Sequence, residues 1–345
     1  MVRASLMMTL TLLSLLTSFA FVVVGIGRIL KGSELAFVQY VETIQLYTIQ
    51  FLDINSDIML ALPVEGYWVD AVWSPDGQHL VFKQRIEETS YVSIADVDGE
   101  ITLIDGGILP TWLSADRLMI WDAQNVGAFR IYSLNPVTLD SQSLDAFPRS
   151  CSDYRLSPDQ RHIACGSSSE EWTMKLYILD SRQVQPPRFV ARSNNYIEYD
   201  WSPEGRTLLY STYDGADNQI SMIDLETGII SQLSTIDWGA ALASSPTSAF
   251  RYPRFAFFTT SSNHTLLRIM DSDGSVNDVD LNALVTAPIR SVGAIEWSPD
   301  GQHLVVELGV VSEYEFDLFL VSLTGTPTMR RLTVGGHYAS STWRP

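Results

Sequence analysis

Short segments in which apolar and polar residues alternate recur along most of the chain. A period of two is the pattern of a strand that buries one face and leaves the other polar. Turns rich in Pro, Asp, Gly and Ser separate the segments and favour tight reversals of the chain. The clearest segments are LYTIQFLD at 46–53, YVSIADVD at 91–98, LYILDS at 176–181, ISMIDLE at 220–226 and LFLVSL at 318–323. The pattern therefore predicts an all-β protein.

One motif returns throughout this region. WSPDGQHLV occurs at 73–81 and again at 297–305, and WSPEGRTLL follows the same pattern at 201–209. If the position of the Trp is taken as the anchor, successive anchors lie 40, 43, 45, 43, 53 and 46 residues apart. A period of about 40–50 residues is typical of the blades of a β-propeller. The anchors are residues 73, 113, 156, 201, 244, 297 and 343, and the fifth motif is the most degenerate.

The two ends of the repeat region complement each other. ELAFV at 34–38 matches the second strand of a blade, HLVFK at 79–83, but no Ser-Pro turn precedes it, while 341–345 contains the front half of the motif. Joined, they would form one blade with its inner strand from the C-terminus and its other three strands from the N-terminal side. Closure of this kind removes exposed sheet edges. We therefore predict a seven-bladed β-propeller over residues 34–345, with six or eight blades as alternatives.

The W-S-P-D-G…L-V-F repeats resemble those of TolB-type propellers, which are relatives of the WD-repeat family. The resemblance covers residues 34–345 and is strongest at 73–82, 201–210 and 297–306. It implies the fold and an extracytoplasmic location, but it carries no activity, because propellers host many functions. We expect no α/β domain of the kind that precedes the TolB propeller. The chain also lacks the G-x-S-x-G motif of propeller-bearing peptidases.

Residues 4–27 form a stretch of 24 residues without a charge, bounded by Arg3 and Arg28. As a helix, at about 1.5 Å per residue, it would span roughly 36 Å, enough to cross a hydrocarbon core of about 30 Å. We expect residues 1–33 to be a single-pass membrane anchor, with a cleaved signal peptide as the alternative. Basic residues balance on its two sides, so the positive-inside rule assigns no orientation. The family resemblance then places the propeller outside the cytoplasmic membrane, in a periplasmic or extracellular location.

The charge of the chain is unevenly distributed. Arg3, Arg28 and Lys31 are the only charged residues among the first 33, so residues 34–345 hold 19 basic and 40 acidic residues, a net charge of −21. A body this acidic repels phosphate-bearing partners, which excludes nucleic acid. A composition that is 46% hydrophobic and 11% aromatic supplies a core and excludes a disordered chain.

Cysteine and histidine do not point to a metal. Cys151 and Cys165 are too few for a cysteine-built zinc site, and the hairpin register leaves open whether they form a disulfide. His79, His162 and His303 occupy equivalent turns of three different blades, so they are not expected to converge on one ion. The short acidic turns lack the distal Glu of a calcium-binding EF-hand loop. We predict no metal, no cofactor and no catalytic residues.

Strand direction divides the predicted propeller into two faces. The Ser-Pro turns and the third-to-fourth-strand turns lie at one end, the turn face, and all other loops lie at the opposite end, the loop face. The anchor enters at Leu35, the start of a second strand and thus on the turn face, so the loop face should point away from the membrane. Aromatic and Arg residues are enriched at interface hot spots. The predicted binding surface on the loop face comprises Tyr67, Trp68, Arg149, Arg192, Tyr196, Trp238, Arg290, His337 and Tyr338.

These observations favour a non-enzymatic, membrane-tethered propeller that binds a protein or glycan outside the cytoplasmic membrane. Alternatively, the loop-face residues plug the channel or pack between blades. The alternative function is a propeller enzyme, a polysaccharide lyase or hydrolase acting at the central funnel, for which only His337 is suitably placed. A third possibility, a structural subunit of an envelope complex, differs from the first in having a permanent partner.

Overall fold

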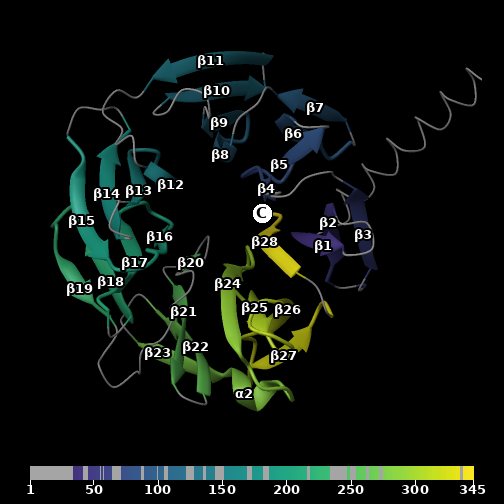
Figure 1. The fold of residues 1–345 in the computed structure, drawn as a ribbon, viewed down its shortest axis with the longest axis vertical. Helices are drawn as coiled ribbons and strands as arrows, with labels where there is room; N and C mark the ends of the chain where they lie inside the picture. The colour runs from purple at the N-terminus through teal and green to yellow at the C-terminus, as the bar shows by residue number, and fades with distance from the viewer. Residues whose placement is uncertain are drawn as a thin grey trace, which may run out of the picture.

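Seven four-stranded antiparallel sheets surround a central axis like the blades of a propeller (Figure 1). The computed structural model describes residues 34–41, 46–54, 56, 58–63, 71–86, 89–98, 100–104, 108–121, 128–134, 137–143, 151–168, 173–181, 186–215, 218–233, 247–248, 254–261, 264–271, 275–334 and 337–345. Within these ranges the sheets hold 28 strands, and one short helix, α2 (Leu281–Leu284), lies between β23 and β24 along the chain. The predicted seven-bladed all-β propeller is confirmed, and the alternatives of six and eight blades are wrong.

Six blades are built from four consecutive strands, which lie in sequence order from the axis outward. The first three are β4 (Ala71–Trp73), β5 (His79–Ile86), β6 (Thr89–Asp96) and β7 (Ile101–Ile104); β8 (Ile108–Ser114), β9 (Arg117–Trp121), β10 (Ala128–Leu134) and β11 (Val137–Ser143); and β12 (Cys151–Leu156), β13 (His162–Ser168), β14 (Met174–Asp180) and β15 (Arg188–Ser193). The next three are β16 (Tyr199–Trp201), β17 (Thr207–Tyr213), β18 (Asn218–Asp224) and β19 (Ile230–Gln232); β20 (Thr247–Ser248), β21 (Phe255–Ser261), β22 (His264–Met270) and β23 (Val276–Asp280); and β24 (Ser291–Trp297), β25 (His303–Gly309), β26 (Asp317–Ser322) and β27 (Thr328–Arg331).

The seventh blade joins the two ends of the described chain. Its inner strand comes from the C-terminal end and its other three strands come from the N-terminal side, so the ring is closed by hydrogen bonds between segments about 300 residues apart. From the axis outward, its strands are β28 (His337–Trp343), β1 (Leu35–Val41), β2 (Leu46–Asp53) and β3 (Ile58–Pro63).

Residues beside the β1–β28 pair extend this closure to the next blade. Leu35 lies opposite Trp343 in the register, and the backbone N–H of Arg344 donates to the carbonyl of Glu34 at 2.8 Å. The Arg344 side chain then reaches the blade of β4–β7, where its Nε donates to the carbonyl of Gly77 at 2.9 Å. The C-terminus lies near the centre of the ring (Figure 1).

The core lies between neighbouring blades. Phe258 and Leu267 of one blade pack with Trp297 and Val306 of the next, and all four side chains are at most 5% exposed. Each blade buries both of its faces in this way, so a middle strand such as β25 is buried along almost its whole length. This explains why the second strands of the blades have nearly continuous apolar stretches and not a strict alternation.

Cys151 on β12 and Cys165 on β13 form a disulfide, with Cα atoms 5.8 Å apart. A β-bulge between Cys151 and Asp153 places Cys151 opposite Ser167, and Cys165 opposite Tyr154. The two cysteines are therefore offset in the ladder, at a Cα separation typical of disulfides. The sequence left this pairing open because the bulge that sets the register has no clear sequence signal.

The predicted membrane anchor, residues 1–33, lies outside the described residues. Among the residues that the structure describes, no helix has the length and apolarity required to span a bilayer.

Candidate functional site

The Ser-Pro turns that follow the inner strands are held by their own hydrogen bonds. The hydroxyl of Ser74 donates to Asp76 Oδ1 at 2.6 Å and accepts from the backbone N–H of His79 at 2.9 Å. Gly77 has a φ of +65°, a conformation that glycine adopts without strain. The same Ser-to-Asp hydrogen bond recurs in the turns of Ser114, Ser157 and Ser298. The motif is thus a locally determined turn, and for this reason it is recognisable in the sequence.

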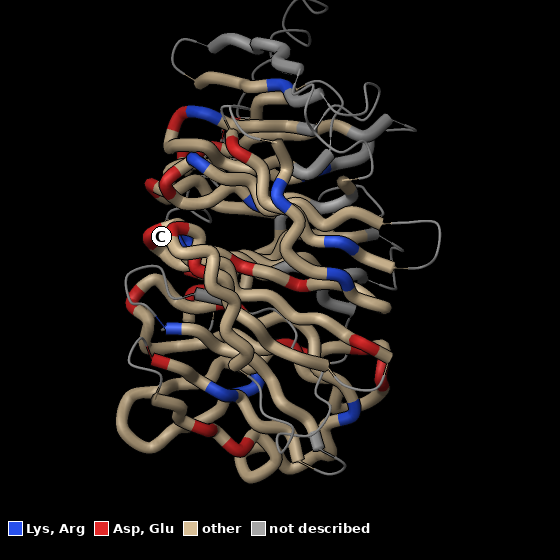
Figure 2. Tube along the Cα trace, turned by 90° about the vertical axis from the view of Figure 1, so that its left-hand side faces the viewer, with Lys and Arg blue, Asp and Glu red and all other residues tan. Residues whose placement is uncertain are grey.

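These hydrogen bonds also favour ionised carboxylates on the turn face. Burial raises the pKa of Asp76, but the hydroxyl of Ser74, the backbone N–H of Gln78 and the neighbouring histidine lower it, and the pKa lies below its ordinary value. Asp300 has a lowered pKa for the same reasons, with Ser298 as the hydroxyl donor. Acidic residues gather along the side of the ring where the C-terminus lies (Figure 2). The turn face therefore has a negative potential.

Tryptophans near the ends of three described inner strands join their blade to the preceding one. Their indole Nε1 atoms donate to backbone carbonyls in three described pairs: Trp112 to Val72 (3.1 Å), Trp201 to Arg155 (2.9 Å) and Trp343 to Glu296 (3.3 Å). Each acceptor belongs to the inner strand of the preceding blade. At the anchor positions of Trp201 and Trp343 the tryptophan is thus a structural brace between blades, and Trp112 makes the same contact from the position before its anchor. The indole N–H of the anchor Trp73 has no hydrogen-bond partner among the described residues.

The turn histidines pack against these tryptophans. The ring centroids of His79 and Trp112 lie 6.2 Å apart, and those of His162 and Trp201 also lie 6.2 Å apart. Each of these two histidines therefore contacts the tryptophan of the following blade. Within the described ranges, no group of three or more His, Cys, Asp or Glu side chains is close enough to hold a metal ion.

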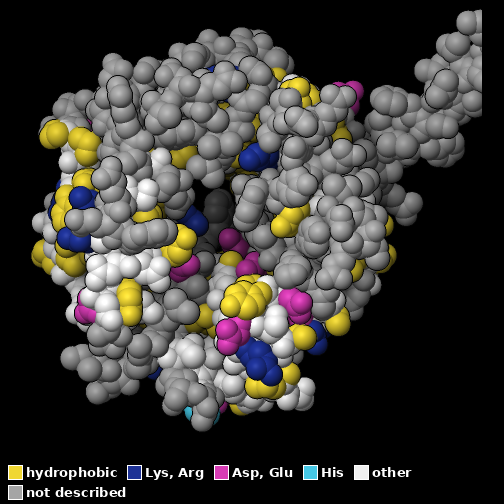
Figure 3. All heavy atoms as spheres, in the orientation of Figure 1, with side chains coloured by type: hydrophobic (Ala, Val, Ile, Leu, Met, Phe, Trp, Pro, Cys, Tyr) yellow, Lys and Arg dark blue, Asp and Glu magenta, His cyan; other side chains and the backbone are white. Residues whose placement is uncertain are grey.

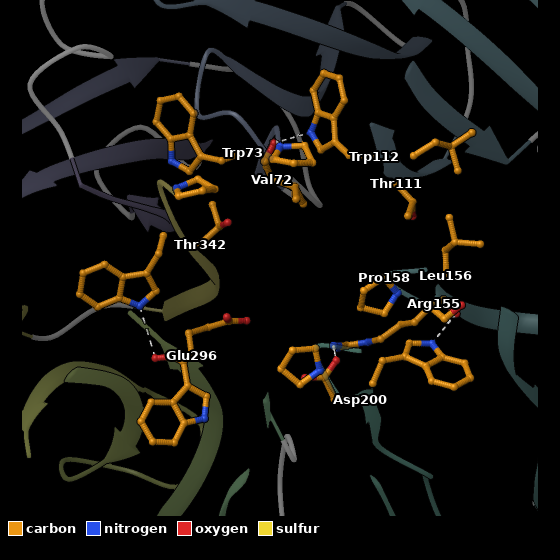
Figure 4. Close-up of a pocket in the computed structure, with 18 of the residues that line it drawn as sticks. Val72, Trp73, Thr111, Trp112, Arg155, Leu156, Pro158, Asp200, Glu296 and Thr342 are labelled. Carbon is orange, nitrogen blue, oxygen red and sulfur yellow. Dashed lines mark hydrogen bonds and ion pairs between the residues drawn. The ribbon is translucent and has the colours of Figure 1, made fainter. Parts of the chain in front are cut away.

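A cavity of about 860 Å³ lies at the turn-face end of the central channel (Figure 4). Its wall is formed by the ends of the inner strands β4, β8, β12, β16, β24 and β28, and its rim includes prolines of the Ser-Pro turns. The position immediately before the anchor contributes to the wall in six blades. The residues at this position are Val72, Trp112, Arg155, Asp200, Glu296 and Thr342.

Three of these six positions carry a charge. Arg155 and Asp200 form an ion pair across neighbouring blades, with Nη1 and Oδ1 3.2 Å apart. Glu296 points into the cavity (Figure 4), and its carboxylate has no hydrogen bond or ion pair to any residue that the structure describes. Burial raises the pKa of Glu296 to about 8; the charge of Arg155 lowers it, and those of Asp200 and Glu307 raise it.

The loop face holds the most exposed large apolar side chains among the described residues. Tyr314, Tyr196 and Val334 are 80%, 78% and 75% exposed. They lie between β25 and β26, between β15 and β16, and between β27 and β28, which are all connections at the loop-face end. Val311, in the same loop as Tyr314, is also exposed. Seen along the ring axis, apolar side chains lie beside acidic and basic ones over the blade of β24–β27 (Figure 3).

Arg290 lies next to the loop at 310–316. Its backbone N–H donates to the carbonyl of Gly309 at 2.8 Å, and the hydroxyl of the adjacent Ser291 donates to the carbonyl of Glu313 at 3.0 Å. A Cβ atom at Gly309 would collide with this loop, so glycine permits the close approach. Arg290 and the loop therefore form one cluster at the loop-face end of their blade.

The structure describes some of the predicted loop-face residues. Tyr196, Arg192 and Arg290 are exposed at that end of the ring. His337 and Tyr338 begin β28 at the same end, opposite Tyr40 and Gln39 of β1. The remaining four lie outside the described residues: Tyr67, Trp68, Arg149 and Trp238. The binding surface stays a prediction.

Four residues of the loop face and the turn-face cavity were not predicted from the sequence. Val311, Tyr314 and Val334 could have been found from strand order alone, because second-to-third-strand and blade-to-blade loops lie on the loop face. Glu296 directly precedes an anchor Trp, and alternation along the strand points it away from the tryptophan side, toward the axis. Charged residues at this position in three repeats were the available signal.

Comparisons with known proteins support the fold. No protein-family model matches the chain, and no curated protein matches it significantly. TolB from Acinetobacter baumannii aligns with a TM-score of 0.56 at 15% identity, over 91% of this chain and 67% of that one. A structure from a study of two prolyl endopeptidases aligns with a TM-score of 0.57 at 13% identity, over 89% of this chain and 51% of that one. A protein from Lactobacillus plantarum aligns with a TM-score of 0.53 at 12% identity, over 89% of this chain and 99% of that one. Such low identities establish the propeller fold and no activity.

Proposed function

We propose that this protein is a non-enzymatic binding propeller, tethered to a membrane by residues 1–33, that presents its loop face to a protein partner outside the cytoplasmic membrane. The observation that carries the proposal is that Tyr196, Tyr314 and Val334, each at least 75% exposed, all lie in connections at the loop-face end. Tyrosine and arginine are enriched at interface hot spots, and Arg290 borders the loop of Tyr314.

The chemistry of this surface favours a protein over a glycan. Val311 and Val334 offer only apolar contact, whereas sugar recognition requires hydrogen-bond partners for hydroxyl groups. Exposed apolar side chains rimmed by charges are typical of protein-interaction surfaces. A glycan remains the alternative occupant, and the experiment below distinguishes the two.

The Cys151–Cys165 disulfide supports an extracytoplasmic location for the propeller. Disulfides persist in oxidising compartments and are rare in the cytosol. The strong negative charge of residues 34–345 is compatible with a location beside a membrane, because the apolar anchor, and not the acidic propeller, would contact the lipid.

A propeller enzyme acting at the central funnel is the alternative function. It would need several histidines or carboxylates converging on one end of the channel. The described part of the ring offers Glu296 and the ion-paired Asp200 at the turn-face end. No observation specifically favours this alternative. One structure with a similar propeller comes from a study of prolyl endopeptidases, but at 13% identity it shares only the fold with this chain.

Loop-face binding is testable with a photo-crosslinking amino acid placed at position 314. We expect a discrete crosslinked product in intact cells, because the Tyr314 side chain is 80% exposed on the proposed interface. The matched control is position 229, where Ile229 is 62% exposed on the turn face. Protease sensitivity of the added mass would identify a protein, and periodate sensitivity would identify a glycan. Equal products from positions 314 and 229 would contradict the assignment of the loop face.

Replacing Tyr314 and Arg290 together by Ala should then weaken capture of the crosslinked partner at least about tenfold, as expected for hot-spot residues. The free energy of unfolding should change by less than about 1 kcal/mol, because exposed side chains contribute little to the core. Unchanged capture would remove these two residues from the interface.

Protease accessibility tests the proposed extracytoplasmic location of the propeller. In intact cells or spheroplasts we expect external protease to digest the propeller while the protein stays in the membrane pellet. Protection until lysis would place the propeller in the cytoplasm and contradict the extracytoplasmic proposal. A cytoplasmic marker protein, which must remain intact, controls for leakage.

A further inference from the structure

Among the described residues that line it, the turn-face cavity contains one carboxylate without a paired positive charge. The charges of Arg155 and Asp200 compensate each other in an ion pair of 3.2 Å. Glu296 faces the same space from β24, and no described residue pairs with its carboxylate. When Glu296 is ionised, these three groups leave the cavity with one uncompensated negative charge.

The walls of the cavity are suited to an organic group. Trp112, Trp343 and Val72 contribute apolar surface, and Pro158 and Pro299 of the Ser-Pro turns line the opening. The volume of about 860 Å³ falls within the range of small-ligand sites, roughly 300–1,000 Å³. An aliphatic stem could lie against this surface while its charged end reaches the carboxylate.

The surroundings favour a monovalent organic cation over a metal ion. A divalent metal needs about six oxygen ligands, whereas the described wall of the cavity offers two carboxylates, of which that of Asp200 is already paired with Arg155. The acidic turn face around the opening, with Asp76 and Asp300 kept ionised, would attract cations of either kind.

We propose that the turn-face cavity binds an organic cation, a guanidinium or ammonium group on an aliphatic stem, with Glu296 as its counter-ion. This site is separate from the loop face, so it stands whether or not the loop-face interface does. The aromatic and proline walls hold the stem, and the carboxylate accepts charge-assisted hydrogen bonds from the cation. Neighbouring tryptophan rings add an attractive surface for the cation.

Binding at this site should be linked to a proton. Burial raises the pKa of Glu296 to about 8, so the group is largely protonated at neutral pH when the cavity is empty. The charged groups that act on it are Arg155 of β12, Asp200 of β16 and Glu307 of β25. A cation favours the ionised form, so binding releases a proton and strengthens as the pH rises toward and beyond that pKa.

The test is a ligand-observed NMR titration of the full chain in mild detergent with N-acetyl-arginine amide. Its matched probe is N-acetyl-citrulline amide, which has the same shape and no charge. We expect the arginine compound to bind at least about tenfold more tightly near pH 8.5, as a charge-assisted contact predicts. Its affinity should increase by at least about fivefold from pH 6.5 to pH 8.5, since the ionised fraction of Glu296 rises over that interval.

Variants assign the effect to the cavity. Glu296→Gln should weaken arginine binding at least about tenfold at pH 8.5 and remove the pH dependence. Asp200→Asn should also weaken it, because Arg155 would then be uncompensated. The matched control is Glu204→Gln, which removes one negative charge from an exposed residue on the turn face outside the cavity wall. This control should retain most of the affinity.

A tripeptide, acetyl-Gly-Arg-Gly-amide, distinguishes the source of the cation. Binding at least about tenfold tighter than the single residue would assign the cation to a polypeptide chain, because flanking backbone adds contacts. Equal or weaker binding would assign it to a small molecule. Equal affinity for the arginine and citrulline probes, unchanged binding by Glu296→Gln, or no binding up to about 10 mM would overturn the proposal.

Discussion

Replacing Trp201 by Ala is expected to lower the free energy of unfolding by about 3–5 kcal/mol, the usual cost of removing a large buried aromatic side chain. Trp201 is 3% exposed and packs with Leu176, Ile178 and Leu208 between two blades. Its indole also donates to the carbonyl of Arg155, which would lose its partner. The measurement is equilibrium unfolding in urea, followed by circular dichroism.

A second substitution separates the packing of this ring from its hydrogen bond. Trp201→Phe keeps most of the apolar volume but removes the donor, so we expect a loss of about 1–2 kcal/mol. Tyr196→Ala, at an exposed position in the loop that precedes β16, is the control and should change stability by less than about 0.5 kcal/mol. A Trp201→Ala variant as stable as the control would contradict the role of the tryptophan as a brace between blades.

Replacing Glu307 by Gln is expected to stabilise the protein in alkaline solution relative to acidic solution, by an amount on the order of 3 kcal/mol. Glu307 is 7% exposed; its Oε2 accepts from the backbone N–H of Ala294 at 3.1 Å, and its Oε1 has no partner among the described residues. Burial raises the pKa of Glu307 from 4.5 to about 7. The folded protein therefore binds this proton more tightly than the unfolded chain does.

The sign of the pH dependence follows from that difference. Below about pH 4.5 the group is protonated in both states and costs nothing. Between about pH 4.5 and 7 wild-type stability declines, because the carboxyl ionises in the unfolded chain while burial keeps it protonated in the folded protein. Gln stays neutral, so the advantage of the variant should grow over that interval and then level off. Urea unfolding of both proteins at about pH 5 and 8 measures it, with the exposed Glu204→Gln as control. A difference that does not change with pH would contradict an ionising, buried Glu307.

The blade architecture could be predicted from the sequence because each blade repeats the same turn and the same pattern of strands. The Ser74–Asp76 turn holds itself together with hydrogen bonds that span only a few residues, and Gly77 supplies the positive φ. The spacing of the repeated motif and the complementary halves of a blade at the two chain ends were likewise visible in the sequence. The disulfide was not readable, because the bulge beside Cys151 shifts the ladder without a recognisable signal.

The candidate surfaces were readable only in part. Strand order placed Tyr196 and Arg290 at the loop-face end, where the structure has them exposed. The same rule also places Tyr314 and Val334 there, but the prediction covered only aromatic, arginine and histidine residues of blade-to-blade loops. Tyr314 lies in a second-to-third-strand loop, and Val334 is aliphatic. Glu296 was overlooked although charged residues precede the anchor in three repeats, because only the closed ring shows which groups face one another across the channel.

The sequence by itself determined the propeller repeat, its four-stranded pattern and the turn and loop faces, because each depends on contacts between residues close in the chain or on a repeated period. It favoured seven blades over six or eight, and the pairing of β1 with β28 decided the number. The tertiary structure decided the disulfide, the tryptophan braces and the cavity into which Glu296 points. Those features join inner strands that are 40 or more residues apart, or depend on the exact register within a hairpin. Distances of that kind are set only when the ring closes and all blades pack at once.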